Sequence, residues 1–280
     1  MNIVDRGHGA PVVLIPGIQG RWEWMRPAVD ALSKQCRVIT FSLADEPTSG
    51  ARFDESAGVW SYVQQVADVL DATGVRHATI CGVSYGGLIA ASFAARHADK
   101  VSALILASAI PPSWRPDARA AFLMRAPLLL SPLFCIGALR ICPEIFAARG
   151  TLPGVAFAAT HVGNVLAHMF SPRLMARRAR MVTSLGVEGE LARVRCPVLV
   201  MTGEATLDRV VPVRLTRDYH RIWPHATEAV LQRTGHLGLI TRPEEFATLV
   251  ASFAVRTRTG PQPAGARAAE SAPAQSADSR

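Results

Sequence analysis

A serine between two glycines stands at residues 82 to 86, which read Gly-Val-Ser-Tyr-Gly. An apolar run suited to a β-strand, His77 to Cys81, precedes it, and a helix-forming run, Gly87 to His97, follows it. A sharp turn between strand and helix lifts the serine hydroxyl off the sheet, and side chains at the two glycine positions would collide there. The pattern predicts a nucleophile at Ser84, and the alternative is a glycine-rich turn with an idle serine.

A serine nucleophile needs a histidine to accept its proton, and that histidine needs a carboxylate to orient it. Of the eight histidines, only His236 follows an expected strand, has a glycine before it and precedes a helix start, at Pro243. We expect His161 and His168 to be packed or solvent-facing on a helix. His236 is therefore the predicted base.

Two carboxylates follow the expected strand Val198 to Thr202, namely Glu204 and Asp208. Asp208 stands in a loop that leads into a helix. Glu204 is so close to the strand end that its longer side chain would have to fold back to reach the histidine. Asp208 is therefore the predicted acid, and Glu204 is the alternative.

Short apolar runs rich in β-branched residues predict the strands that position these side chains. They are Val12 to Ile15, Arg37 to Leu43, Ala78 to Cys81, Ala103 to Ala107, Val198 to Thr202 and Glu228 to Leu231. Most are separated by segments with helical periodicity, such as Val59 to Leu70. Continuously apolar strands that alternate with helices predict an α/β fold with a mostly parallel sheet covered on both faces.

The alternation stops after Ala109, and the chain is helix-like from Pro111 to about Arg195. Ser171 and Pro172 form a good helix start, followed by an apolar stripe at Leu174, Met181 and Leu185. We expect a core of residues 1–110 and 196–256 and a helical cap of residues 111–195 over the serine. From 257 to 280 the chain is mostly small or polar residues and proline, which predicts a disordered tail.

The net charge of +8 is concentrated in the predicted cap, because residues 113–195 hold eleven arginines against four acidic residues. No lysine-rich run or recognition helix is present, so we expect no nucleic-acid partner. A solvated arginine face accounts for the charge. The alternative is attraction of an anionic substrate or acidic surface by a helical stripe of Arg173, Arg177 and Arg180.

The remaining composition predicts a cytoplasmic protein without metal or cofactor. Its five cysteines show no C-x-x-C spacing, which argues against a zinc site or a disulfide framework. The N-terminus lacks the pattern of a signal peptide. The longest uncharged stretch, 14 residues between Arg125 and Arg140, is too short for a stable membrane span. The oligomeric state is left open.

Taken together, the chain resembles the α/β-hydrolase fold superfamily, in its cap-bearing, small-molecule branch. The order Ser84, Asp208, His236 matches the order of the family's catalytic triad, and the resemblance covers about Gly7 to Val255. It implies that the backbone amides of Ile18 and Tyr85 form the oxyanion hole. The family usually has His-Gly in that loop, whereas this chain reads Ile-Pro-Gly-Ile-Gln-Gly from residue 15 to 20.

Two further departures and one exclusion follow from the resemblance. Relatives usually have a Gly-x-Ser turn after the next strand, where this chain has Ala44 to Gly50 with Asp45 and Glu46 inside it, and the N-terminal hairpin is short. Relatives that dehalogenate alkanes or open epoxides use aspartate at the elbow, so Ser84 argues against both reactions. Apolar residues of the predicted cap would form its core and an acyl pocket: Phe122, Leu123, Leu128 to Leu130, Phe134, Phe157 and Met169.

The predicted function is therefore serine-dependent hydrolysis of a small, partly apolar substrate. The bond is an ester, or a related thioester, lactone or carbon-carbon bond. The alternatives are an acyltransferase and a non-catalytic ligand-binding protein that kept the fold.

Overall fold

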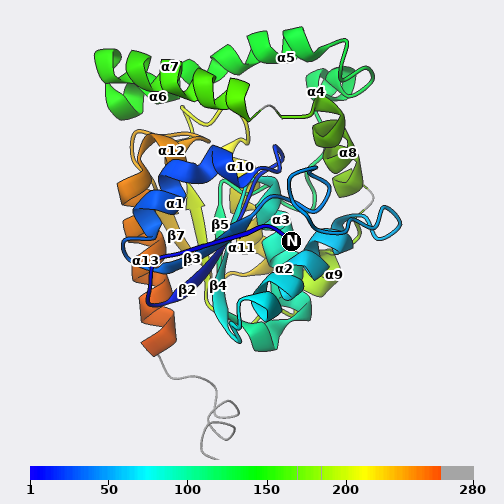
Figure 1. Cartoon of the computed structure of the whole chain (residues 1–280), viewed down its shortest axis with the longest axis vertical. Helices are drawn as coiled ribbons and strands as arrows, with labels where there is room; N and C mark the ends of the chain where they lie inside the picture. Colours follow the sequence, from blue (N-terminus) through cyan, green and yellow to red (C-terminus); the bar gives the residue numbers. More distant parts are fainter. Residues whose placement is uncertain (169, 184, 260–280) are drawn as a thin grey trace, which may run out of the picture.

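One seven-stranded sheet organises the chain (Figure 1). The structure, a computed structural model, describes residues 1–168, 170–183 and 185–259. Along the sheet the strands follow the order β1-β3-β2-β4-β5-β6-β7, and all neighbours are parallel except β1 and β3. The strands are β1 (Ile3–Arg6), β2 (Pro11–Ile15), β3 (Arg37–Phe41), β4 (Ala78–Val83), β5 (Val101–Ala107), β6 (Val198–Thr202) and β7 (Thr227–Val230). The predicted mostly parallel α/β sheet is confirmed.

The N-terminal strand differs from the sequence-based expectation. No strand was predicted before Val12, yet Ile3–Arg6 forms β1 at the sheet edge and pairs antiparallel with β3. The short hairpin implied by the family resemblance is absent from the N-terminal part that the structure describes, because β3 lies between β1 and β2. Its sequence has two apolar residues followed by Asp5 and Arg6, so it lacks the continuous apolar run by which the central strands were recognised.

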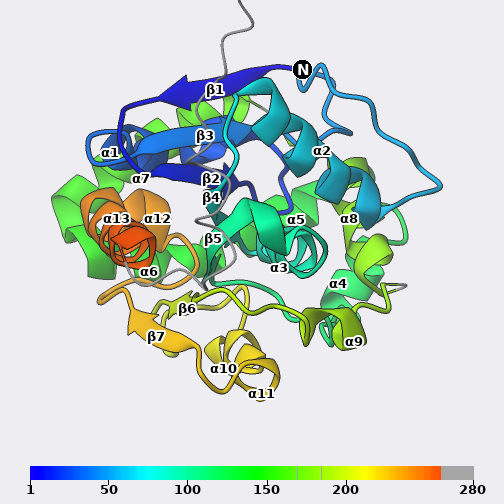
Figure 2. The same ribbon diagram turned by 90° about the horizontal axis from the view of Figure 1, so that it is seen from below.

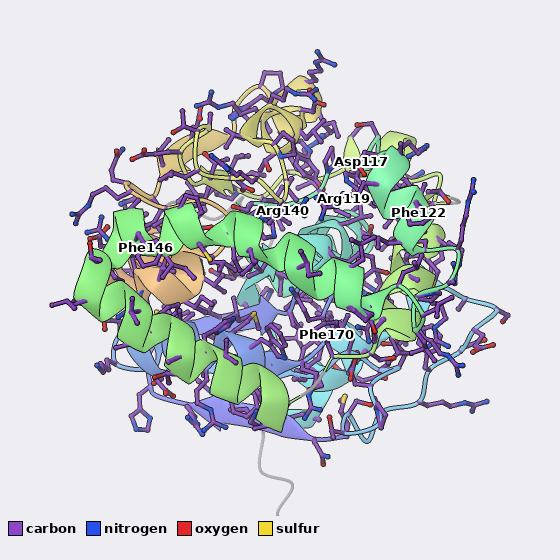
Figure 3. The ribbon with its side chains drawn as sticks, turned by 90° about the horizontal axis from the view of Figure 1, so that it is seen from above. Asp117, Arg119, Phe122, Arg140, Phe146 and Phe170 are labelled. Atoms are coloured by element: carbon purple, nitrogen blue, oxygen red, sulfur yellow. The ribbon has the colours of Figure 1, made fainter. Side chains whose placement is uncertain are left out.

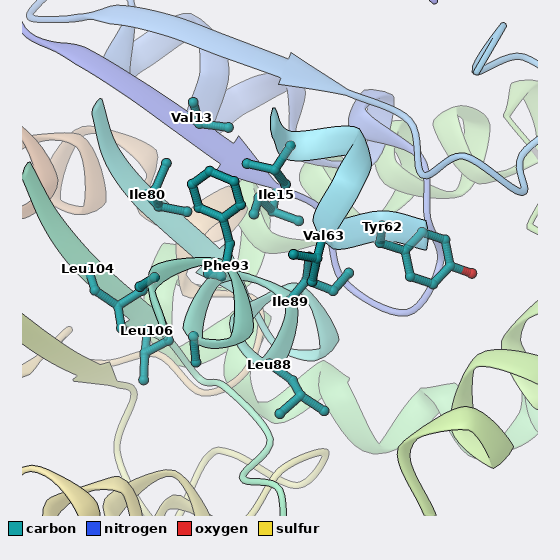
Figure 4. Close-up of a cluster of buried hydrophobic side chains, with 14 of the residues drawn as sticks. Val13, Ile15, Tyr62, Val63, Ile80, Leu88, Ile89, Phe93, Leu104 and Leu106 are labelled. Atoms are coloured by element: carbon teal, nitrogen blue, oxygen red, sulfur yellow. The ribbon is translucent and has the colours of Figure 1, made fainter. Parts of the chain in front are cut away.

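Each central strand sends alternate side chains into two separate hydrophobic cores. Val13, Ile80 and Leu104 enter the core shared with α2 and α3 (Figure 4). Their neighbours Leu14 and Cys81 enter the opposite core, shared with α1 and α13. This alternation is the period of two expected of a strand, and Figure 2 shows α2 and α3 on one face of the sheet and α1 and α13 on the other. The sheet is thus covered on both sides.

The helices that cover the sheet lie between consecutive strands or follow the last one. They are α1 (Arg26–Leu32), α2 (Val59–Ala72), α3 (Tyr85–Arg96), α10 (Val213–Arg217), α11 (Tyr219–Ile222), α12 (Gly238–Thr241) and α13 (Pro243–Thr259), with 3₁₀ turns η1 (Trp22–Met25) and η2 (Ala98–Lys100). Helix α13 buries Phe246, Val250 and Phe253 in the core that it shares with α1. The helix continues beyond the predicted end of the core at residue 256, and residues 260–280 of the predicted tail lie outside the described residues.

Between β5 and β6 the chain forms helices and, in its described part, no strand. The elements are α4 (Ala118–Leu123), α5 (Ser131–Ala138), η3 (Leu139–Ile141), α6 (Cys142–Arg149), α7 (Thr151–Ala167), α8 (Pro172–Thr183) and α9 (Glu188–Leu191). Helices α5, α6 and α7 lie across one end of the molecule (Figure 1). Helix α9 instead belongs to the main body, because Val187, Leu191 and Val194 are buried in the core beside α3. We call α4 to α8 the cap helices.

The predicted helix start before α8 has the expected hydrogen bond, since the Leu174 amide donates to Ser171 Oγ at 3.3 Å. The expectation that the apolar residues of the cap form its core was wrong for several of them. Phe122 is 47% exposed, Leu128 48% and Leu129 80%. The side chain of Phe134, and Met169 altogether, lie outside the described residues. Among the helices of the described ranges, none is long and apolar enough to cross a membrane.

Candidate active site

Ser84 occupies a strained turn between β4 and α3. Its φ of 53° and ψ of −116° lie in a region that non-glycine residues rarely adopt. The Ser84 amide donates to the Ala107 carbonyl at 2.9 Å, and the Ser84 carbonyl accepts from the amides of Gly87 and Ile110. These backbone hydrogen bonds to neighbouring segments hold the strained conformation in place.

The two flanking glycines are required by close backbone contacts. A Cβ at position 82 would lie 2.2 Å from the Gly86 carbonyl oxygen, and a Cβ at position 86 would lie 2.4 Å from that of Pro16. A side chain at either glycine position would therefore collide with the backbone, as inferred from the sequence. Because Gly86 also contacts the loop after β2, the turn at Ser84 and the proposed oxyanion loop are packed together.

His236 and Asp208 are paired, although they are far apart in the sequence. His236 Nδ1 lies 3.4 Å from Asp208 Oδ2, and the two side chains are 10% and 1% exposed. Asp208 Oδ1 accepts hydrogen bonds from the amides of Val210 and Val211. Burial alone would raise the pKa of the Asp208 carboxyl, but His236 and these amides lower it below its ordinary value. Asp208 is therefore held as a carboxylate beside the imidazole.

Glu204, the alternative acid, is used elsewhere. Its Oε1 accepts a hydrogen bond from the Arg233 amide at 2.6 Å, so its carboxylate supports the turn after β7. The structure thus brings Asp208 next to His236 and directs Glu204 to a backbone group.

The loops that carry these side chains follow the carboxyl ends of parallel strands and therefore lie at the same end of the sheet. Ser84, Asp208 and His236 follow β4, β6 and β7 in turn. A small cavity beneath the histidine is lined by residues from all of these strand ends, including Val83, Ser108, Gly203 and His236. Val83, the residue before the serine, and His236 therefore border the same cavity.

The proposed oxyanion-hole residues lie against the serine. A Cβ at Gly17 would be 3.5 Å from the Ser84 Cβ, which places the loop with Ile18 over the turn. Tyr85 is the first residue of α3, where amides have no acceptor within the helix. The Gly17 backbone and the first turn of α3 therefore both lie at Ser84, and the role of the two amides as an oxyanion hole stays a prediction.

Arg178 of α8 is a charged residue at this site that the sequence analysis missed. Its side chain is fully buried, and Nη1 donates to the Ile18 carbonyl at 2.8 Å. It also binds Asp45, at 2.5 Å, and Glu46, at 2.6 Å. Burial alone would lower the pKa of Arg178, but Asp45 raises it above its ordinary value. The unusual loop at Asp45 and Glu46 is therefore the partner of this arginine.

A sequence signal for Arg178 exists in retrospect. The predicted apolar stripe includes Leu174 and Met181 of α8, whereas Leu185 lies beyond the end of the helix at Thr183, and position 178 falls on the same stripe at helical spacing. An arginine on a buried face requires an opposite charge.

Two of the three arginines of the predicted helical stripe have partners in the structure. Arg177 pairs with Asp45 at 3.0 Å and with Glu55 at 2.7 Å, and Arg180 donates to the Met124 carbonyl.

Glu144 of α6 is a second missed residue, and it contacts the histidine loop. It is 1% exposed, and its Oε1 accepts from the Leu237 amide at 2.6 Å. Burial raises the pKa of this carboxyl to about 7, against the opposing effects of the Gly235 amide and His236. A helix far away in sequence thus contacts the residue that follows His236.

The two cap histidines, His161 and His168, pack against neighbouring groups, which is one of the two arrangements expected from the sequence. His161 stacks on Phe157 with ring centroids 5.7 Å apart and meets Trp24 edge-on. Burial lowers the pKa of His161. His168 Nδ1 lies 3.2 Å from the Asn164 carbonyl oxygen. Neither contact involves Ser84, so both histidines have structural explanations.

The family model of the alpha/beta hydrolase family matches residues 12–249. The chain therefore belongs to this family, which agrees with the parallel sheet and the strand-turn-helix at the serine.

Comparison with individual proteins supports a hydrolase. The chain is 28% identical to the pimeloyl-acyl-carrier-protein methyl ester esterase of Aliivibrio salmonicida, over 88% of this chain and 93% of that protein. Among solved structures it resembles an esterase from Exiguobacterium antarcticum, with a TM-score of 0.73, 21% identity and coverage of 90% and 94%. A bromoperoxidase from Bacillus anthracis gives a TM-score of 0.73, 20% identity and coverage of 91% and 94%. The structural likenesses establish the fold, and the family establishes the hydrolase class.

Proposed function

We propose that the chain is a serine hydrolase that cleaves an ester of a small, partly apolar acyl group. The observation that carries the proposal is the buried pair of His236 and Asp208, which lies at the same end of the parallel strands as the strained Ser84 turn. The similarity to an esterase named for a pimeloyl methyl ester favours an oxygen ester of an acyl chain. Thioesters, lactones and carbon-carbon bonds are the related alternatives.

The first half of the reaction forms an acyl-enzyme. Ser84 Oγ attacks the carbonyl carbon while His236 takes the hydroxyl proton, and Asp208 stabilises the imidazolium and keeps Nδ1 protonated. The carbonyl oxygen becomes an oxyanion, which the amides of Ile18 and Tyr85 stabilise by about 3 kcal/mol each. The bond to the leaving alkoxide then breaks, and His236 returns the proton to it as an alcohol.

The second half releases the acid. Water attacks the acyl carbon and gives its proton to His236, the oxyanion forms again, and its collapse frees Ser84 with the histidine proton. If an alcohol or amine took the place of water, the same steps would transfer the acyl group to it. An acyltransferase therefore differs from a hydrolase in the acceptor alone.

The proposal is tested with an active-site probe. A fluorophosphonate should label the wild-type protein at Ser84, and Ser84→Ala should abolish labelling and lower kcat/KM for p-nitrophenyl esters by roughly three to six orders of magnitude. Ser108→Ala is the matched control, because Ser108 borders the same cavity and should still permit labelling of Ser84.

The outcomes separate the alternatives. A protein that binds esters but is neither labelled nor active would be a ligand-binding member of the fold. Labelling with slow hydrolysis that an added alcohol accelerates would identify an acyltransferase.

A further inference from the structure

The turn that carries the proposed oxyanion hole is fixed at several points. The Gly20 amide donates to the Gly17 carbonyl at 2.9 Å. Because the Gly17 carbonyl and the Ile18 amide belong to one planar peptide unit, this bond also sets the direction of the Ile18 N–H. The next carbonyl, that of Ile18, accepts from Arg178 at 2.8 Å. The Gly20 carbonyl accepts from the Leu43 amide at 2.7 Å, just before the loop of Asp45.

Arg178 is the one side chain in these contacts, and it comes from a cap helix. Its guanidinium links α8 to two loops, because it binds the Ile18 carbonyl in one and the carboxylates of Asp45 and Glu46 in the other. Position 20 leaves room for it because Gly20 has a φ of 79° and no side chain; a Cβ would lie 2.3 Å from Arg178 Nη1. The two loops that depart from the family pattern, residues 15–20 and 44–50, therefore both contact Arg178.

We infer that Arg178 is a positioning residue for the oxyanion hole, in a chain that lacks the histidine its relatives have in this loop. The inference rests on the proposed function. A planar guanidinium binds Asp45 through two nitrogens and still reaches the Ile18 carbonyl, which a lysine ammonium could not reproduce. Asp45 and Glu46 supply the opposite charge that keeps the buried cation in place.

The experiment compares Arg178→Lys with Arg177→Lys. Arg177 lies on the same helix and binds the same Asp45, but its second partner is Glu55 and not the Ile18 carbonyl. Arg178→Lys should lower kcat by about 10- to 100-fold with little change in KM, because a misplaced donor acts on the transition state. An alkylboronic acid, which forms a tetrahedral adduct with the serine, should bind more weakly by a similar factor. Arg177→Lys should change neither quantity.

The readouts distinguish positioning from general destabilisation. If Arg178→Lys does not fold, Asp45→Asn offers the same comparison. It weakens the ion pair with the Arg178 guanidinium while the side chain at position 45 keeps its size. Unchanged kcat and boronate affinity in a stably folded variant would overturn the inference and leave the proposed function intact. Absence of Ser84 labelling in the wild-type protein would overturn both.

A second observation is independent of catalysis and concerns the outer surface of the cap helices. Of the twelve exposed large apolar residues among those described, ten lie between residues 122 and 162, including Leu129 at 80% and Leu152 at 83% exposure. Single exposed apolar residues are ordinary, but a concentration of this kind marks an interaction surface. We call these ten residues the apical surface; besides Leu129 and Leu152 they are Phe122, Leu128, Leu133, Ile136, Leu139, Phe146, Val155 and Val162.

The charge of this segment identifies the kind of partner. Residues 118–168 contain four arginines, of which Arg149 donates to the Ile240 carbonyl and lies over the Phe157 ring, and their one acidic residue, Glu144, is buried. Seen from above, Phe122, Phe146, Arg119 and Arg140 lie on the end of the molecule formed by the cap helices (Figure 3). In the same view Asp117 lies near Arg119 and Phe122, and its carboxylate accepts a hydrogen bond from the Ala120 amide at the start of α4. Exposed leucines and isoleucines among arginines fit apolar acyl chains beneath anionic headgroups.

We propose that the apical surface binds the face of an anionic lipid bilayer. The protein should co-sediment with vesicles of phosphatidylcholine and phosphatidylglycerol, less with phosphatidylcholine alone, and less as salt increases. Leu129→Asp and Leu152→Asp should each weaken binding at least about tenfold, because each places a charge where acyl chains would be. Val255→Asp is the matched control: it changes the charge equally at an exposed residue of α13 and should bind as the wild type does.

Other results would overturn this proposal. If all three variants bound both kinds of vesicle equally well, the apical surface would not be the part of the protein that contacts the bilayer. A lack of vesicle binding, with a dimer in analytical ultracentrifugation that Leu129→Asp dissociates, would show that a second copy covers this surface. A lack of vesicle binding by a monomer would also exclude the bilayer.

Discussion

The acid that serves His236 can be identified by comparing two carboxylates on one loop. Asp208→Asn keeps the shape of the side chain but removes the charge that stabilises the imidazolium. We expect kcat/KM for esters to fall by about three orders of magnitude. Glu204→Gln should leave kcat/KM within about threefold, because Glu204 binds the Arg233 amide. A larger loss in Glu204→Gln than in Asp208→Asn, at equal Tm, would contradict the assignment.

The buried carboxyl of Glu144 predicts a pH dependence of stability. Its pKa of about 7 in the folded protein lies above the value of 4.5 for an exposed glutamate. The folded state therefore binds more protons than the unfolded state between these values, and the free energy of unfolding falls as pH rises from about 4.5 to about 7. Glu144→Gln keeps an acceptor for the Leu237 amide and should remove up to about 3 kcal/mol of this fall.

Urea denaturation at several pH values between about 5 and 8 measures the effect. The control is Glu244→Gln, an exposed residue at the start of α13, which should follow the wild-type curve. A Glu144→Gln curve parallel to that of the wild type would show that the carboxyl does not take up a proton on folding in this range.

Single residues differ in how far the sequence could predict them. Ser84, Asp208 and His236 could be predicted as a candidate triad because each follows a strand end, where a parallel sheet brings loops together. The contacts of Arg178 with Ile18 and of Glu144 with Leu237 were not predicted. They depend on how the cap helices sit on the core, and local spacing does not encode that placement.

At the level of elements, the six strands that follow residue 10 were predicted and the N-terminal one was not, although β7 is as exposed as β1. β4 is buried at every residue, so its apolar run gave a clear pattern. β1 has two half-buried and two exposed residues and gains its place from pairing with β3. The cap was predicted as helical, but its apolar residues do not predict which of them are exposed, since helices apolar on all sides carry no directional signal.

The turn between β4 and α3 provides a test at the level of one element. Gly86→Ala would place a Cβ 2.4 Å from the Pro16 carbonyl oxygen and 2.6 Å from that of Ile15. Backbone must move to relieve these contacts, so we expect a loss of about 3 kcal/mol in the free energy of unfolding, together with loss of activity. The measurement is urea denaturation.

Gly163 in α7 is the control for this substitution, because nothing lies within 4 Å of a Cβ there. Gly163→Ala should be neutral or stabilising by up to about 1 kcal/mol. A Gly86→Ala variant as stable as Gly163→Ala would mean that the strand-turn-helix packs less tightly than described.

For the whole molecule, the two faces of the sheet contribute differently to the site. Helix α3 on one face carries the proposed oxyanion amide of Tyr85 at its start. On the other face, Phe246 of α13 is 1% exposed and lines the cavity beneath His236. Packing on both faces therefore reaches the proposed catalytic residues, and the C-terminal helix is part of the same folding unit as the candidate site.

Truncation before Pro243 tests this dependence. It removes the buried side chains of Phe246, Val250 and Phe253, each worth about 2 kcal/mol. The sum is comparable with the total stability of a typical domain, so the shortened chain should be unfolded and inactive. Truncation after Arg256 keeps all three side chains and should preserve Tm and kcat/KM. A folded, active protein without α13 would show that the other face of the sheet alone supports the catalytic loops, and that Phe246 does not hold His236 in place.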